Sequence, residues 1–193
     1  MTLSNKMLGA IAMVAAPLLS FQKLGGGHAA NANNISLGGV FDLIYMLGWM
    51  CSIVGLMRLQ ATATSKKSSV LLYIQLALLC VANTWNVWVI FDPLNNSALF
   101  RVLDMFWPLS NVNMLVLGIA IAVTGRLKGW RRYVVLIVGL WLPVALGGSL
   151  LLGRENGAAF YTGCVYSTVA WALLGWMIYT SGPGEQKNVQ LAL

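Results

Sequence analysis

Apolar residues form six long runs separated by short polar connections. The runs cover about residues 3–22, 37–58, 68–91, 99–124, 132–153 and 158–180. Each is close to the roughly 20 residues that a helix needs to cross the hydrocarbon core of a bilayer. We therefore predict an all-α polytopic membrane protein, in which residues 1–193 form a single domain of six transmembrane helices with short loops.

The first run also has a feature of a secretory signal peptide, because Lys6 precedes its apolar stretch. The segment that follows, Gln22–Gly27, makes a poor and overlong cleavage region. We therefore predict that the first run is retained as a helix. Pro17 and Pro143 predict kinks in the first and fifth runs.

The composition supports a bilayer environment. Hydrophobic residues make up 59% of the chain, charged residues only 9%, and the mean hydropathy is +0.76. Soluble domains have about one quarter charged residues, so a soluble fold of this chain would lack the polar residues to cover its surface. Membrane lipids are therefore the first expected partners.

The net charge of +7 indicates topology once the charges are located. Six spans place both termini on one side, and that side carries nine of the twelve Lys and Arg residues: Lys6, Arg58, Lys66, Lys67, Arg126, Lys128, Arg131, Arg132 and Lys187. The other side has Lys23, Arg101 and Arg154. The positive-inside rule then predicts cytoplasmic N- and C-termini. The basic loops are interpreted as anchors that contact lipid headgroups, not nucleic acid, in a multi-pass protein of a bacterial cytoplasmic membrane.

The fourth run begins with polar residues that a membrane helix does not need. Asp104, Trp107 and Asn111 fall on one stripe of a helix. A carboxylate about one turn inside the hydrocarbon edge is unfavourable against lipid, so Asp104 is expected to face the bundle or water. Pro108 also removes the hydrogen bond to the backbone carbonyl of Asp104. Two acceptors therefore lie at this point, and they need donors.

The third run offers such donors at the same predicted depth. Asn83 and Asn86 lie near its outer end, and the short connection to the fourth run makes the two helices antiparallel neighbours. We expect these amides to meet Asp104 in an outer-leaflet pocket. Trp85, Trp88 and Trp107 are its predicted walls, although an aromatic belt or hydrogen bonds that simply join helices also explain these residue types.

A weak internal repeat adds a second carboxylate. The segment that starts at Phe41 matches in kind the segment that starts at Leu103, and each places an aspartate near the outer end of an even-numbered run. Trp49 shares a stripe with Asp42, near mid-membrane where an interfacial belt is not needed. The candidate ligand-binding residues are Asp104, Asn83, Asn86, Asn111, Trp85, Trp88, Trp107, Asp42 and Trp49.

The sequence has little material for cofactors or familiar catalysis. The three cysteines lie in apolar runs with no metal-ligand spacing, and His28 is the single histidine. There is no HExxH, nucleophile elbow, phosphate-cradling glycine motif or cysteine pair. We predict no metal, no cofactor and no catalytic residues.

Three functional interpretations follow from these patterns. The leading one is a non-catalytic carrier or sensor that binds a small lipophilic or cationic ligand in the outer-leaflet pocket. The second is an accessory or assembly subunit of a membrane complex, or a homo-oligomer, whose polar residues join helices and partners. The third is a lipid-modifying enzyme that uses Asp42 or Asp104 for acid–base chemistry.

Overall fold

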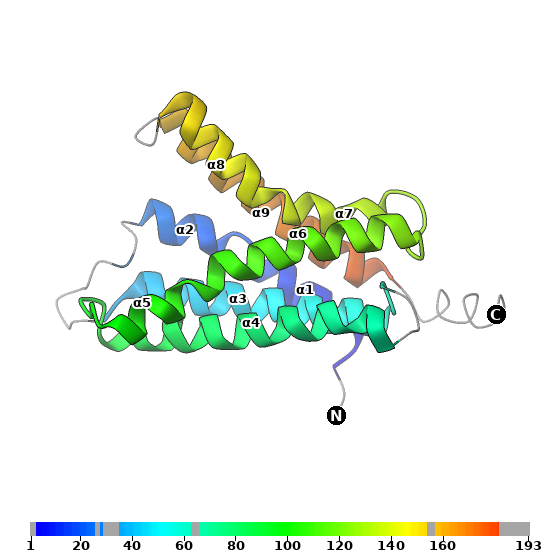
Figure 1. Cartoon of the computed structure of the whole chain (residues 1–193), viewed down its shortest axis with the longest axis horizontal. Coiled ribbons are helices and arrows are strands. Elements are labelled where there is room, and N and C mark those ends of the chain that lie inside the picture. The colour runs from blue at the N-terminus through cyan, green and yellow to red at the C-terminus, as the bar shows by residue number, and fades with distance from the viewer. Residues whose placement is uncertain (1–2, 26–27, 29–34, 63–65, 154–156, 182–193) are drawn as a thin grey trace.

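The computed structural model describes residues 3–25, 28, 35–62, 66–153 and 157–181, with the backbone alone for residues 66–68. Arg154 and Lys187, which entered the charge count, lie outside these residues. The described chain is all-α and forms an elongated bundle (Figure 1). Its helices are α1 (Asn5–Ala15), α2 (Leu18–Leu24), α3 (Leu37–Arg58), α4 (Lys66–Phe91), α5 (Ala98–Asp104), α6 (Phe106–Thr124), α7 (Arg131–Gly139), α8 (Trp141–Leu152) and α9 (Gly157–Thr180).

The helices reproduce the six apolar runs. In the described residues, five helical stretches are long and apolar enough to cross a membrane, and α7 with α8 makes a sixth if this bent pair is one span. This confirms an all-helical chain with the helices of an integral membrane protein. The side on which the termini lie stays a prediction.

Three of the six spans are broken, each near a proline. The first breaks between α1 and α2 at Pro17. The fourth breaks at Met105, three residues before Pro108, and the fifth breaks at Leu140, three residues before Pro143, with a bend of 44°. Proline crowds the carbonyl four residues back, which explains breaks at these places. The short segments α2, α5 and α8 lie toward the same end of the bundle (Figure 1).

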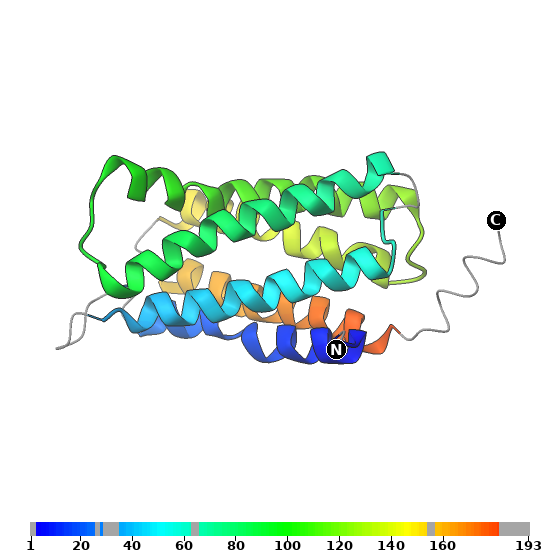
Figure 2. The same ribbon diagram turned by 90° about the horizontal axis from the view of Figure 1, so that it is seen from below.

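Small residues set the closest helix contacts. A Cβ added at Gly118 on α6 would lie 2.5 Å from the Cα of Leu136 on α7, and one added at Gly139 would lie 2.5 Å from the Cα of Leu115 on α6. Such backbone-to-backbone contact is common where apolar side chains alone cannot drive association in lipid. α3 lies between α1 and α4 (Figure 2). The N-terminal half of α3 is therefore central at the end of the bundle where the short segments α2, α5 and α8 lie.

Candidate functional site

A cavity of about 210 Å³ lies among α2, α3, α4 and the α5–α6 break. Four spans and one connection contribute to it. Its lining residues are Leu19, Gln22, Lys23, His28, Asp42, Tyr45, Met46, Ala82, Trp85, Asn86, Leu103, Asp104 and Trp107. Charged and aromatic side chains therefore converge in one place within an otherwise apolar bundle.

Asp42 is the buried acid of this cavity. It is 9% exposed, on the second turn of α3, and its Oδ2 lies 2.7 Å from the Nε2 of His28. This hydrogen bond joins the imidazole to the carboxyl group, and the imidazole ring packs edge-on against Trp85 with 5.1 Å between centroids. The second carboxylate oxygen, Oδ1, has no hydrogen-bond partner in the described part of the chain. This oxygen is buried, and it is the half of the carboxylate that the described residues leave without a hydrogen bond.

Asp104 brings a second carboxylate to the same cavity. It is the last residue of α5, directly before the break at Met105, and its electrostatic neighbours include His28 and Asp42. Lys23 of α2 also lines the cavity, and its Nζ lies 4.9 Å from the ring centroid of Trp141. Two carboxylates therefore share the cavity with one ammonium group and one imidazole.

An aromatic cluster lies beneath the charged groups. Tyr45 lines the cavity, and its ring centroid is 5.6 Å from that of Trp171 and 6.1 Å from that of Trp49. Trp107, another lining residue, contacts Trp141 at 5.3 Å. Among the described residues, the Tyr45 hydroxyl and the indole nitrogens of Trp49 and Trp171 have no hydrogen-bond partner. The cavity therefore borders a buried aromatic cluster, and this cluster contains polar atoms that have no hydrogen bond in the described residues.

The structure brings together five of the nine predicted site residues. These line the cavity: Asp42, Trp85, Asn86, Asp104 and Trp107. The other four lie elsewhere: Trp49 packs on Tyr45, Trp88 packs on Phe100 at 5.8 Å, Asn111 donates to the carbonyl of Trp107 at 3.0 Å, and Asn83 donates to the Sδ of Met50 at 3.2 Å. Whether any of the nine contacts a ligand stays a prediction.

Asn86 lines the same cavity as Asp104, but the hydrogen bonds of the two asparagines in the described chain go to other partners. Nδ2 of Asn86 donates to the Sδ of Met46 at 3.1 Å and to the Oδ1 of Asn83 at 3.0 Å. These amides therefore hold α4 against α3, while Asp104, whose side chain is exposed, lies within electrostatic range of His28 and Asp42. The hydrogen bonds of Asn83 fit the interpretation that such amides join helices.

Eight of the thirteen lining residues were not predicted, and Tyr45, Lys23 and His28 are three of these. Tyr45 follows Asp42 by three residues, so helical periodicity alone places the two on one face of α3. Lys23 is the cation at the outer end of the first run, where a lysine side chain usually extends toward water. His28 lies in a connection, and no helical pattern predicts where a connection places its side chains.

The described part of the chain gives no indication of a metal site. Among the described residues, no group of three or more His, Cys, Asp or Glu side chains is placed to hold a metal ion. Cys51, Cys80 and Cys164 are free thiols. The cavity thus offers hydrogen bonds, charge and aromatic faces as its means of recognition.

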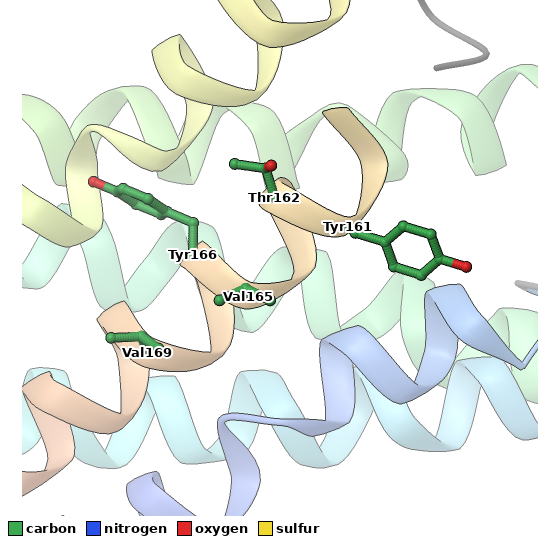
Figure 3. A pocket seen from close by; sticks show the side chains of 5 residues that line it. All are labelled: Tyr161, Thr162, Val165, Tyr166 and Val169. Carbon is green, nitrogen blue, oxygen red and sulfur yellow. The ribbon is translucent and has the colours of Figure 1, made fainter. Parts of the chain in front are cut away.

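A second, larger hollow of about 500 Å³ lies on the surface of α9 (Figure 3). Its lining residues are Tyr161, Thr162, Val165, Tyr166 and Val169. Tyr161 and Tyr166 point away from each other (Figure 3), and the hydroxyl of Tyr166 donates to the carbonyl of Ile137 at 2.7 Å. This apolar helix face is suited to contact with acyl chains, and it carries no charged group that would select a ligand.

Comparisons with protein-family models, with curated protein sequences and with solved structures found no match.

Proposed function

We propose that the protein is a non-catalytic membrane carrier or sensor, and that its cavity binds a small organic cation with a lipophilic body. One observation carries this proposal: the carboxylates of Asp42 and Asp104 face one cavity, and the Oδ1 of Asp42 has no partner in the described residues. A charge inside a membrane bundle is unfavourable unless it is paired, and such charges commonly mark a ligand or ion pathway. A ligand ammonium group supplies the missing charge, and a polar group of the ligand supplies the missing donor.

The walls favour an organic cation over a bare inorganic one. Trp85 and Trp107 line the cavity beside the two acids, and aromatic faces attract cations while they exclude water. Lys23 already makes this kind of contact with Trp141, at 4.9 Å. An aromatic or aliphatic amine combines an apolar body for the indoles with a positive head for the carboxylates.

The volume limits the size of the ligand. An apolar protein cavity of about 150 Å³ accommodates benzene. The present cavity of about 210 Å³ therefore suits one six-membered ring with a short amine arm. Phenethylamine, which consists of such a ring, a two-carbon arm and a primary amine, is an appropriate probe.

The broken helices support a carrier or sensor. α2, α5 and α8 are short segments that follow or precede breaks, and α2 and α5 both contribute to the cavity. Discontinuous helices commonly surround the substrate site of transporters, because their ends can move and supply free backbone groups. The predicted topology places this end of the bundle on the outer side of the membrane.

The experiment measures ligand-dependent stabilisation in lipid nanodiscs. Phenethylamine at about one hundred times its Kd should stabilise the wild-type protein by roughly 2.7 kcal/mol, and Asp104→Asn should abolish this stabilisation while the protein still inserts. Asp92→Asn is the matched control, because Asp92 lies in the connection after α4, where its Oδ2 accepts a hydrogen bond from Asn95 at 2.7 Å. Equal stabilisation of wild type and Asp104→Asn would refute the proposal.

The accessory-subunit interpretation is the second candidate, and the bonds from Asn83 to Met50 and from Asn86 to Met46 favour it. It expects polar residues that join helices and a chain that copurifies with a partner. It also expects that amines do not stabilise the protein. A monodisperse monomer in native lipid that is stabilised by phenethylamine would exclude it.

A further inference from the structure

Two buried polar atoms of the cavity lack partners and lie on the same face of α3. Asp42 and Tyr45 are three residues apart, and both line the cavity. Tyr45 is 1% exposed, and its hydroxyl has no hydrogen-bond partner in the described residues, like the Oδ1 of Asp42. Buried polar groups of proteins almost always have a partner, which is a bound molecule if it is not the protein itself.

The two atoms do not satisfy each other. The Tyr45 hydroxyl is within electrostatic range of the Asp42 carboxylate, yet both atoms are without a hydrogen bond in the described chain. The Oδ2 of Asp42 is already bonded to His28 at 2.7 Å, so Oδ1 is the carboxylate oxygen that is left without a hydrogen bond. Two residues that line the cavity thus contain an unpaired donor, the buried tyrosine O–H, and an unpaired acceptor, the buried carboxylate oxygen.

We propose that the cavity recognises a hydroxyl group on its amine ligand, with the Tyr45 hydroxyl donating to it and the Oδ1 of Asp42 accepting from it. This inference rests on the proposed function, and it names the ligand class as small hydroxylated amines. The ammonium group of the ligand then lies beside Asp104, which lines the cavity from α5 in the fourth span.

A hydroxyl group fits this pair better than the other common polar groups do. A carbonyl oxygen accepts from Tyr45 but has no hydrogen for Asp42. An ammonium group donates to Asp42 but leaves the tyrosine O–H without an acceptor. A hydroxyl group does both at once. A water molecule does so as well, and the experiment separates the two.

The test compares four probes on the wild-type protein in nanodiscs by titration calorimetry, with empty nanodiscs subtracted. Phenethylamine is the reference. The other three probes, 2-, 3- and 4-hydroxyphenethylamine, each carry one ring hydroxyl, and they differ in the distance between this hydroxyl and the ammonium group. At least one hydroxylated probe should bind about tenfold more tightly than phenethylamine, because an analogue without the hydroxyl leaves buried polar groups of the site unpaired. This comparison needs no variant.

Tyr45→Phe then tests the assigned contact. It should reduce that preference, measured as the ratio of the two Kd values in the same variant, to less than about threefold, because phenylalanine keeps the ring and removes only the hydroxyl. Tyr73→Phe is the matched control, because Tyr73 lies on α4 and is 63% exposed. This variant should keep the full preference.

The outcomes separate the two proposals. If phenethylamine binds and no hydroxylated probe is preferred, a water molecule pairs the two atoms and the inference is overturned while the proposed function stands. If the preference survives in Tyr45→Phe, the assignment to Tyr45 is overturned. If none of the four amines binds, the proposed function itself fails.

Discussion

The contact between α6 and α7 offers a direct test of the packing. Gly118 lies in the middle of α6, and a Cβ added there would lie 2.5 Å from the Cα and 2.7 Å from the N of Leu136 on α7. These are backbone atoms, which cannot rotate away as the end of a side chain can. Gly118→Ala therefore forces the two helices apart or distorts one of them.

The structure gives the size of this effect. Ordinary van der Waals contact begins at 3.4 Å, so the backbones must separate by about 0.9 Å, the difference between 3.4 and 2.5 Å. Overpacking of this kind costs about 1–3 kcal/mol, from which the better helix propensity of alanine subtracts up to about 1 kcal/mol. With about 1 kcal/mol subtracted, we expect a net loss of up to about 2 kcal/mol in the free energy of unfolding.

Gly147→Ala is the matched control. Gly147 is inside α8, and a Cβ there would meet no heavy atom of the described chain within 4 Å. The same substitution should leave stability unchanged or raise it by up to about 1 kcal/mol. Reversible unfolding in mixed micelles, followed by tryptophan fluorescence, measures both variants. Equal stability of Gly118→Ala and Gly147→Ala would refute the close approach of α6 and α7.

Two further predictions concern the cavity and its surroundings. A double-mutant cycle of His28→Ala and Asp42→Asn should return a coupling of about 1–2 kcal/mol in unfolding free energy, because the bond of 2.7 Å joins an imidazole to a buried carboxylate; additive effects would mean that the pair is not formed. Asn83→Ala should lower the free energy of unfolding by about 0.6 kcal/mol, because the contact of Asn83 with Met50 is lost. The Kd of phenethylamine should stay unchanged, and a change in that Kd would mean that Asn83 belongs to the binding site.

The sequence was sufficient for the helical architecture because membrane spans are determined by length and hydropathy. The six apolar runs became the described helices. Pro17 and Pro143 predicted kinks in the first and fifth runs, and the structure breaks the helices at Pro17 and three residues before Pro143. Breaks are predictable because proline acts on its own helix. Sidedness depends on charges at both ends of the bundle and was not testable from the fold.

The site was predictable only in part. The cost of a carboxylate against lipid and the internal repeat drew attention to Asp104 and Asp42, and both line the cavity, Asp104 with an exposed side chain. Helical periodicity gives the direction of a side chain about its own axis, but it does not give the neighbour that it meets. For this reason Asn83 was assigned to Asp104, although it contacts Met50. His28 reaches Asp42 from a connection, for which the sequence contains no periodic signal.

A crystal structure of the protein grown from a lipid phase with phenethylamine tests the central claim most directly. We expect the amine in the cavity, with its nitrogen within about 4 Å of a carboxylate oxygen of Asp42 or Asp104 and its ring against Trp85 or Trp107. A cavity closed by side chains that hydrogen-bond to one another, or an amine bound only at the lipid-facing surface, would contradict it.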